Sequence, residues 1–481
     1  MTNTLRYWIL TCYIVLTPTL SLSQLVISEA SPFSSFNDVT GESYDWIELY
    51  NSSTDTLLLS DYQISDDTEN WGKWIFPSDS LPPDSTILLL ASGKDQRYVV
   101  DHWEQILGDG YLCRYITPNS PVDNDWTSLN FDDSSWQTGP LSIGYGDNDD
   151  NTIISSASSI YIRRQFEIDS FDNVKYLSFH IDYDDGFIAY INGVEIARSS
   201  NMSNIIGEYN DFAGFEHEAV IYSGEVPDVY VFDYEFLTQN LFEGTNILSI
   251  QVHNASANSS DLTARPFLHI GVFDEVNLGN NEPSNWWTIP KTYYHSNFKL
   301  NTGEPLIISK VDDSLIDVIT LNENLRDEIS MGYNSNNYNS ICYYDMPTPG
   351  YSNENSWCYS GIEDEPVFTH PSGWYDENIG VGLQTNNSDA IIKFTMNGDE
   401  PLNSDEYYSS PISLYETSII SAKAFSTNNN LPSSTSDAIY ILNEQQAGIN
   451  VFSVITDSLN LWDWETGIYV LGDNASSNYP Y

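Results

Sequence analysis

Short runs in which hydrophobic and polar residues alternate follow one another along almost the whole chain. Clusters of Asn, Asp, Ser, Gly and Pro separate these runs, and the 3.6-residue repeat of an amphipathic helix is nearly absent. In the segment DWIELYN, Trp46 and Glu48 fall on one face of a strand, and Ile47 and Leu49 fall on the other. Alternation of this kind between turn-forming clusters is typical of sandwiches and barrels. The pattern therefore predicts an all-β protein.

Two short segments interrupt the alternation. They are DHWEQIL, at Asp101–Leu107, and YEFLTQNLF, at Tyr234–Phe242. Each is predicted to form an isolated helical turn.

The stretch FHIDYDDGFIAYINGVEIARS, at Phe179–Ser199, gives the strongest local signal. Its runs 187–191 and 194–198 flank Asn192 and Gly193. An Asn-Gly pair between two strand-like runs favours a type I′ turn, because both turn positions need a positive φ. A β-hairpin is predicted here, with a further turn just before it at Asp184-Asp185-Gly186.

The N-terminus has the features of a secretory signal peptide. A lone charge at Arg6 precedes an apolar stretch from Tyr7 to about Leu20, which is too short for a comfortable membrane span. Ser21 and Ser23 occupy the small-residue positions before a cleavage site. We expect residues 1–23 to be removed and the protein to be secreted, extracellular or on the cell surface, without a membrane span. The alternative is that the segment stays as an uncleaved anchor.

The overall charge argues against two classes of partner, nucleic acid and anionic lipid. The 481 residues include 69 Asp and Glu against 16 Lys and Arg, so the formal net charge is −53. Such a field repels nucleic acid and anionic lipid. Hydrophobic residues make up 41% of the chain and aromatic residues 14%, which argues for folded cores rather than disorder. The partners that remain are a glycan or an extracellular protein.

Three cysteines lie beyond the predicted cleavage site. Cys342 and Cys358 flank a loop rich in Pro and Gly, and an exported chain permits disulfides. Closing a loop of about 15 residues stabilises a fold by roughly 3 kcal/mol in the entropy model. We weigh this bridge against two free thiols. Cys113 is left over, and its simplest role is that of a buried thiol.

A series of residues near the N-terminus resembles the lamin-tail domain, an immunoglobulin-like β-sandwich. The matching residues are Ser28-Glu29, Asp45-Trp46-Ile47-Glu48, Asn51, Leu59-Ser60-Asp61-Tyr62, Ile64-Ser65-Asp66-Asp67, Trp74 and Phe76-Pro77. The resemblance stops near Lys94 and resumes from Ser296 to Asn353. It implies one sandwich in two parts, residues 24–94 and 286–355, split by an inserted domain. The alternative is two unrelated β pieces.

The insert, residues 95–285, resembles galactose-binding-like jelly rolls. The matching residues are Trp126, Phe131-Asp132-Asp133, Trp136, Asp184-Asp185-Gly186, Asn192-Gly193, Asn246 and His253-Asn254. Members of that family bind sugars or serve as scaffolds, so the resemblance implies one of these two roles.

Two further resemblances follow a short linker at residues 356–365. Residues 366–443 resemble the small C-terminal sandwich of chitobiases and hexosaminidases, through Asn397-Gly398-Asp399-Glu400-Pro401 and Ala422-Lys423-Ala424. Residues 444–481 resemble the start of the spore-coat-H kinase-like domain, through Thr456-Asp457 and Glu465-Thr466-Gly467. The chain stops before the nucleotide and metal residues of that family, so the second resemblance assigns no catalytic residue.

Two acidic clusters in the insert suggest a cation site. One contains Asp147, Asp149, Asp150 and Asn151, and the other contains Asp182, Asp184 and Asp185. Oxygen ligands of this kind suit a structural Ca²⁺. The alternative is that water solvates both clusters. Neither cluster is an EF-hand. The first has Thr152 and Ser158 where that loop has its glycine and final glutamate, and in the second Gly186 comes one residue early.

The same carboxylates could instead form a glycosidase pair. Such a pair needs a closed cleft and one carboxyl group whose pKa burial raises. The acids lie in turns rich in Asn and Gly that should be wet, so we expect no catalytic residue in this chain. The full-length product could still be an enzyme.

Sugar binding by the insert would rest on aromatic faces. Tyr145, Tyr183 and Tyr209 are candidates because they lie near loops, where their rings could stack on a pyranose. Trp136 is expected in the core.

Three functions remain open. In the first, a secreted or cell-surface modular protein attaches to glycan or protein without catalysis. In the second, these domains are the N-terminal accessory region of a secreted spore-coat-H kinase-like enzyme. In the third, they are inert spacers.

Overall fold

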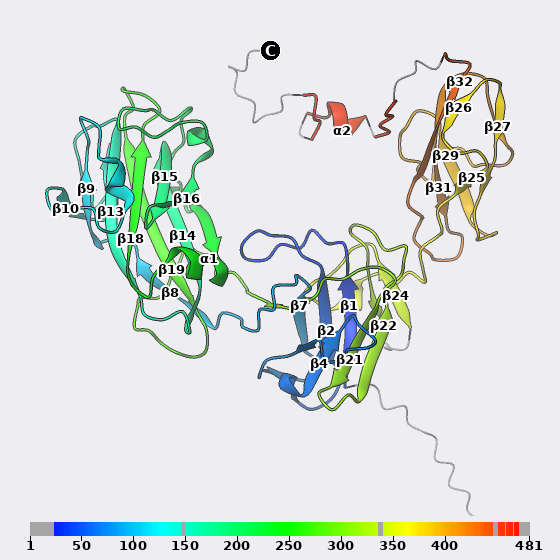
Figure 1. Ribbon diagram of the computed structural model, residues 1–481, viewed down its shortest axis with the longest axis horizontal. Coiled ribbons are helices and arrows are strands. Elements are labelled where there is room, and N and C mark those ends of the chain that lie inside the picture. Colours follow the sequence, from blue (N-terminus) through cyan, green and yellow to red (C-terminus); the bar gives the residue numbers. More distant parts are fainter. Residues whose placement is uncertain are drawn as a thin grey trace, which may run out of the picture. The chain divides into compact units, whose positions relative to one another are not determined.

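The computed structural model describes residues 24–146, 150–334, 340–445, 451–456, 458–464 and 466–470. Their regular structure is almost entirely β-strand, so the predicted all-β class is confirmed (Figure 1). None of the helices in these residues has the length and hydrophobicity needed to cross a bilayer. The predicted signal peptide, residues 1–23, lies outside the described residues.

The chain forms two compact units. Of the described residues, the first contains those up to Ser35, Asp45–Asp95 and those from His295 onward. The second contains Phe36–Tyr44 and Gln96–Tyr294.

The lamin-tail-like part of the first unit is a sandwich of two sheets. One sheet has the order β20-β7-β2-β1-β23-β24, and the other has the order β22-β21-β4-β5. The strands of the first sheet are β1 (Leu25–Ser31), β2 (Trp46–Asn51), β7 (Thr86–Leu90), β20 (Tyr294–His295), β23 (Ser330–Tyr333) and β24 (Ile341–Tyr344). Those of the second are β4 (Tyr62–Ser65), β5 (Trp74–Ile75), β21 (Pro305–Lys310) and β22 (Leu315–Thr320). A separate small pair joins β3 (Leu57–Leu58) to β6 (Ser80–Leu81).

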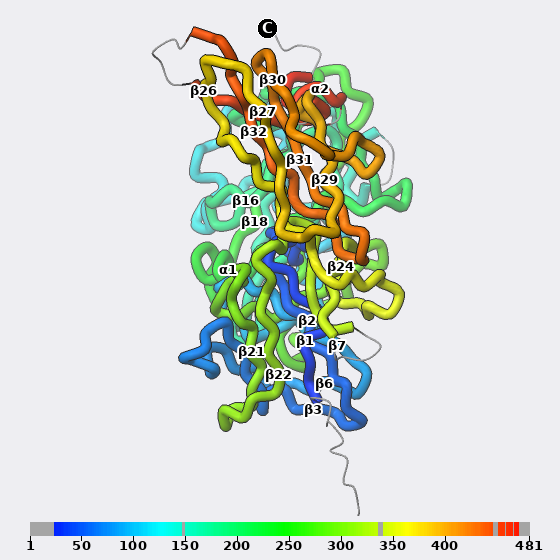
Figure 2. The backbone as a smooth tube through the Cα atoms, turned by 90° about the vertical axis from the view of Figure 1, so that its right-hand side faces the viewer, coloured from blue at the N-terminus to red at the C-terminus, as the bar shows by residue number. Residues whose placement is uncertain are grey.

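Each sheet combines strands that are far apart in the sequence. In the first sheet β1 pairs with β23, with Ala30 opposite Met331. In the second sheet β4 pairs with β21, with Ile64 opposite Ile308. Figure 2 shows β1, β2 and β7 in blue, and β21 and β22 beside one another in green. The segments before and after the insert therefore build one sandwich together.

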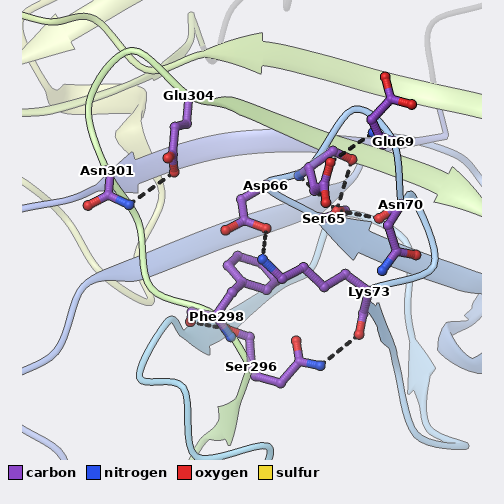
Figure 3. Close-up of polar contacts among 11 residues, drawn as sticks. Ser65, Asp66, Glu69, Asn70, Lys73, Ser296, Phe298, Asn301 and Glu304 are labelled. Carbon is purple, nitrogen blue, oxygen red and sulfur yellow. Dashed lines mark hydrogen bonds and ion pairs between the residues drawn. The ribbon is translucent and has the colours of Figure 1, made fainter.

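Side chains also connect the two parts of this sandwich (Figure 3). Lys73, from the loop between β4 and β5, forms an ion pair with Asp66 and lies over the ring of Phe298, 5.4 Å from its centroid. Asn297 donates a hydrogen bond to the carbonyl of Lys73, at 2.8 Å. The residues just after the insert therefore close over the loop at 66–73.

The chain leaves this sandwich and returns to it at almost the same point. Ser296 donates its backbone N–H to the carbonyl of Leu90, at 2.8 Å, and accepts the N–H of Asp95, at 3.1 Å. The departing and returning strands are thus neighbours at the sheet edge.

The second unit is a sandwich of two larger sheets. One has the order β10-β9-β13-β18-β15-β16, and the other has the order β12-β11-β19-β14-β17, with β8 also paired to β19. The strands of the first are β9 (Leu112–Ile116), β10 (Gln137–Pro140), β13 (Ser159–Ile168), β15 (Gly186–Ile191), β16 (Val194–Arg198) and β18 (Gly244–His253). Those of the second are β8 (His102–Leu107), β11 (Ile143–Tyr145), β12 (Thr152–Ile153), β14 (Val174–Asp184), β17 (Asp228–Phe232) and β19 (Leu262–Val272). Buried aliphatic and aromatic side chains fill the space between them.

The two predicted helical turns have different outcomes. Tyr234–Asn240 forms helix α1, and Asp233 caps it by accepting the N–H of Phe236, so this prediction is confirmed. The prediction for 101–107 is wrong, because His102–Leu107 is strand β8. Pairing with β19 along this segment supplies backbone hydrogen bonds that a six-residue pattern cannot anticipate.

The predicted hairpin is confirmed. β15 pairs with β16 across a turn in which Asn192 and Gly193 have φ of 50° and 88°. The turn before it has a different role, because β14 and β15 belong to different sheets. Asp184 and Asp185, joined by a cis peptide bond, form the corner at which the chain passes from one sheet to the other.

The C-terminal sandwich is smaller. Its main sheet has the order β26-β32-β31-β29, beside the pairs β25-β28 and β27-β30. The strands are β25 (Val367–Phe368), β26 (Gly373–Tyr375), β27 (Ile379–Val381), β28 (Leu383–Gln384), β29 (Ile391–Thr395), β30 (Ile412–Leu414), β31 (Ser418–Phe425) and β32 (Ser436–Leu442). Helix α2 (Leu459–Trp462) follows. Short 3₁₀ turns are η1 (Leu59–Asp61), η2 (Asn124–Thr127), η3 (Ser200–Met202), η4 (Ile221–Ser223) and η5 (Asn353–Asn355).

The cysteines take two different states. Cys342 and Cys358 form a disulfide that encloses a sequence separation of 16 residues. Cys113 is a buried free thiol in the core of the second unit, and burial raises its pKa to about 12.

Candidate functional site

The acidic corner of the second unit is buried, so the expectation of wet turns there is wrong. Asp182, Asp184 and Asp185 are 2%, 4% and 2% exposed. Asp182 accepts the backbone N–H groups of Val220, at 2.6 Å, and Ile221. The physical reason is the change of sheet at this corner, where folded loops replace water as hydrogen-bond donors.

Asp185 also accepts backbone N–H groups, from the loop that contains His217 and the loop that contains Ala255. It accepts the N–H of His217, at 2.8 Å, and that of Ala255, at 2.6 Å. A carboxylate that accepts backbone N–H groups joins those segments, since buried amides need partners. Asp182 and Asp185 therefore position the loops that follow β16 and β18.

Asp184 belongs to a different group. It lies with Glu218 and Asp261, and one carboxylate oxygen from each residue is within 4.8 Å of the others. Glu218 and Asp261 come from loops far from Asp184 in the sequence, so spacing alone could not have found them. Three carboxylate oxygens at this separation are ligands of the type that Ca²⁺ prefers.

The other predicted acidic cluster is only partly described. Asp147 and Asp149 lie outside the described residues. Asp150 accepts a hydrogen bond from the Ser142 hydroxyl, and Asn151 donates to the carbonyl of Leu141 at 2.6 Å. Both described members therefore hold the loop that contains them.

Two of the three tyrosines proposed for sugar stacking are not accessible. Tyr145 and Tyr183 are only 8% and 4% exposed, and both belong to the core between the sheets. Tyr183 stacks on His217 with ring centroids 4.1 Å apart, and it donates a hydrogen bond to Asp228. The expectation that these two tyrosines are exposed is wrong, because each side chain lies on the inward face of its strand.

Tyr209 borders an aromatic cleft of about 310 Å³ in the second unit. Four aromatic rings and several hydrogen-bonding side chains line it. The residues that matter below are Trp126, Tyr161, Tyr190, Glu208, Tyr209 and Gln251.

The period of strand β13 determines which residues reach this cleft. Ile160 and Ile162 point into the core between the sheets, so Tyr161 between them points to the outer face. There it meets Trp126, with ring centroids 4.6 Å apart. Trp126 also lies 6.3 Å from Trp136, which is 7% exposed, as expected for a core residue.

A glycine forms one wall of the aromatic cleft. Gly207 has a φ of +87°, and a Cβ atom at this position would come within 2.6 Å of the Gln251 amide nitrogen. Its carbonyl accepts the hydroxyl proton of Tyr161, at 3.0 Å. The Gln251 amide nitrogen in turn donates to the Tyr190 hydroxyl, at 3.3 Å. These contacts fix both tyrosine rings.

The aromatic cleft offers apolar faces together with neutral and charged polar groups. Burial raises the pKa values of Tyr161 and Tyr190, so both hydroxyls stay neutral at ordinary pH. Glu208 is exposed at the rim, and Tyr209 is half-buried beside it. Sequence reasoning found Tyr209 but missed Tyr161, Tyr190 and Gln251, because the strand face that they share depends on which sheet face the loops cover.

Comparison with known proteins identifies two parts of the chain. Residues 18–169 match the model of the lamin tail domain, and residues 370–436 match that of the chitobiase/β-hexosaminidase C-terminal domain. No curated protein matches the chain. The resemblance of residues 95–285 to galactose-binding-like domains and that of 444–481 to spore-coat-H kinase-like domains stay predictions.

Solved structures with partial similarity include several β-glucuronidases. One from glycoside hydrolase family 2 has 10% identity and a TM-score of 0.24, over 71% of this chain and 30% of that one. One from an uncultured Clostridium species has 10% identity and a TM-score of 0.21, over 71% and 45%. The Bacteroides uniformis enzyme has 10% identity and a TM-score of 0.24, over 70% and 32%. This chain thus spans less than half the length of these enzymes. The two domain matches, to the lamin tail domain and the chitobiase/β-hexosaminidase C-terminal domain, are the resemblances that the comparisons support.

Proposed function

We propose that the second unit binds a saccharide in the aromatic cleft, and that the protein attaches to a glycan outside the cell. The observation that carries this proposal is a cleft bordered by the half-buried rings of Tyr190 and Tyr209, which are supported by the buried rings of Trp126 and Tyr161. The described region acts in this proposal by binding rather than by catalysis.

The chemistry of the aromatic cleft suits a sugar. A pyranose ring has one apolar face of C–H groups and a rim of hydroxyls, so it needs both an aromatic surface and hydrogen-bonding groups. Aromatic rings supply a rigid apolar surface. The exposed side chains of Glu208 and Asn124 supply the polar groups. A volume of about 310 Å³ is at the lower end of the range for small-molecule sites.

The extracellular setting has separate support. The Cys342–Cys358 disulfide is of a kind that persists in oxidising compartments. The N-terminal sequence has the pattern of a signal peptide, and the charge of −53 suits a soluble protein that avoids anionic surfaces.

A glycan array with the full chain tests the proposal, followed by titration of any saccharide that binds. Tyr209→Ala removes one half-buried ring, and we expect affinity to fall about 10-fold, which corresponds to roughly 1.4 kcal/mol. Tyr222→Ala is the control, because Tyr222 is 70% exposed in the same unit and lies outside the aromatic cleft. If no saccharide on the array binds reproducibly, the proposed function is wrong, and the role of an inert spacer is favoured instead.

A further inference from the structure

A second hollow in the same unit is lined by three arginines. The whole chain has only 16 Lys and Arg residues, yet Arg114, Arg163 and Arg164 all border this hollow of about 330 Å³. We call it the arginine notch. It also includes Asp133, Thr138 and Gln165.

The arginine notch forms where two strands separate. β9 pairs with β13 from Ile116 to Arg114, and the pairing ends with Arg114 opposite Arg163. Beyond this point β9 stays with β10, whereas β13 continues beside β18 as far as Ile168. The gap between the diverging strands leaves room for a ligand next to the guanidinium groups.

One arginine of the three is structural. Arg163 is 1% exposed and forms an ion pair with Asp133, at 2.9 Å. It also donates to the carbonyls of Trp126 and Ser128. Asp133 therefore balances the charge of Arg163, and the contacts of Arg163 hold the loop that carries Trp126.

The other two arginines are not balanced in the same way. Arg114 lies 3.9 Å from Asp133, its side chain is 42% exposed, and it donates to the Thr138 hydroxyl at 2.7 Å. Arg164 donates a hydrogen bond from one guanidinium nitrogen to the carbonyl of Leu112, at 2.9 Å. Its Nε is buried and has no hydrogen-bond partner among the described residues. Arg114 and Arg163, which are opposite one another, share Asp133 on one face of the sheet. Arg164, the next residue of β13, points to the other face and borders the hollow from there.

The arginine notch is locally positive, although the net charge of the whole chain is −53. At about 0.15 M salt the Debye length is roughly 8 Å, so the distant carboxylates are largely screened while the adjacent arginines are not. Guanidinium groups match carboxylate and sulfate groups through paired N–H donors. An anionic group is therefore the ligand that fits.

We propose that the arginine notch is an oxyanion site that takes the carboxylate or sulfate group of an acidic saccharide. The oxyanion site stands on its own geometry, whereas the assignment to a saccharide rests on the proposed function. Tyr161 lines the aromatic cleft and Arg163 lines the arginine notch two residues further along the same face of β13. That spacing is about 7 Å along a strand.

The test is calorimetric titration of the full chain in 0.15 M NaCl. The ligands are oligogalacturonate, a sulfated galactan oligosaccharide, a neutral galactan oligosaccharide of the same length, and sodium sulfate alone. The first two distinguish carboxylate from sulfate as the preferred group. We expect at least one acidic oligosaccharide to bind about 10-fold more tightly than the neutral one, the effect of one charge-assisted contact.

Arg114→Gln should abolish this preference and leave the neutral oligosaccharide unaffected. Arg114→Lys keeps the positive charge but loses the paired N–H donors of the guanidinium group. This variant should therefore retain part of the preference for acidic oligosaccharides. Lys291→Gln is the matched control, since it removes one exposed positive charge of the same unit outside the arginine notch. Equal effects of Arg114→Gln and Lys291→Gln would overturn the site, because they would indicate a general effect of charge.

The two proposals fail in different ways. If acidic and neutral oligosaccharides bind equally and sulfate does not bind, the oxyanion site is wrong and the proposed function stands. If no saccharide binds in this titration or on the glycan array, but sulfate binds in an Arg114-dependent way, the proposed function is wrong and the oxyanion site stands.

Discussion

His180 and His269 lie on neighbouring strands with their ring centroids 5.1 Å apart, and both side chains are fully buried. Trp286 and Trp287 cover them, with the Trp287 ring 4.7 Å from His180 and 4.5 Å from His269. Burial lowers the pKa of each histidine to about 3. The pair is therefore neutral in the folded second unit at every pH near neutrality.

Acid should destabilise the second unit because of this pair. Each histidine has an ordinary pKa of 6.5 and a folded value of about 3, so the unfolded state binds protons first as the pH falls. One pKa unit corresponds to 1.36 kcal/mol, so each histidine should contribute a loss of about 2 kcal/mol between pH 7 and 5. Protection factors of β14 and β19 peptides in the full chain, corrected for the intrinsic pH dependence of amide exchange, measure this loss. His269→Leu should reduce it by about half.

The lamin-tail-like sandwich should respond in the opposite direction. Burial raises the pKa values of Glu29 and Asp317, and it raises that of Asp45 to about 6. A carboxyl group whose folded pKa is raised takes up its proton in the folded state first, so stability increases as the pH falls from 7 through the folded pKa. The protection factors of β1 and β23 peptides, which correct for the intrinsic pH dependence of amide exchange, should rise between pH 7 and 5. Lower protection factors in both units would contradict this prediction.

Gly207→Ala should damage the aromatic cleft. The added methyl group would come within 2.6 Å of the Gln251 amide and 2.8 Å of the Ile188 side chain, at a φ of +87°. We expect a loss of about 2–4 kcal/mol, from backbone strain and overpacking together. Gly224→Ala is a matched control, because its φ is also +87° but nothing lies within 4 Å. Denaturant unfolding of the two variants measures the difference, and equal losses would exclude the steric contribution.

Loss of the Cys342–Cys358 disulfide should lower the stability of the first unit. A closed loop of this size is worth about 3 kcal/mol in the entropy model. The double variant Cys342→Ser/Cys358→Ser should therefore melt earlier, as followed by exchange of β24 peptides. Cys113→Ser in the second unit is the control, and β24 protection should be unchanged in that variant.

Calcium provides a test of the acidic corner. If Asp184, Glu218 and Asp261 hold Ca²⁺, the ion should raise the melting temperature of the chain, and chelator should reverse the shift. Glu218→Gln should weaken the effect, while Glu216→Gln, at an exposed neighbouring position, should not. A melting curve that is insensitive to calcium would leave the corner as a structural feature alone.

Local chemistry explains what the sequence could predict. The hairpin at Asn192 and Gly193 depends on backbone preferences within a few residues, so its prediction succeeded. The burial of Asp182 and Asp185 depends on loops more than 30 residues away that donate their N–H groups. No pattern in the turn itself contains that information.

The aromatic cleft was predictable only in part for a related reason. Tyr209 lies in a polar stretch that signals exposure, whereas Tyr145 has a similar context and is buried. Strand pairing decides between them, because Tyr145 lies in β11 opposite Leu262 of β19. Alternation gives two faces to each strand, but only the order of strands in a sheet tells which face is covered.

The hydrogen bonds of Ser296 with Leu90 and Asp95 also have an evolutionary consequence. Because the chain departs and returns at adjacent backbone positions, the lamin-tail-like strands need not move to accommodate what lies between them. A short Gly-Ser linker in place of 96–293 should be enough to reconnect them while strand β20 (Tyr294–His295) is kept. The same junction would let recombination replace the inserted domain with another ligand-binding domain, while the lamin-tail-like sandwich stayed the same.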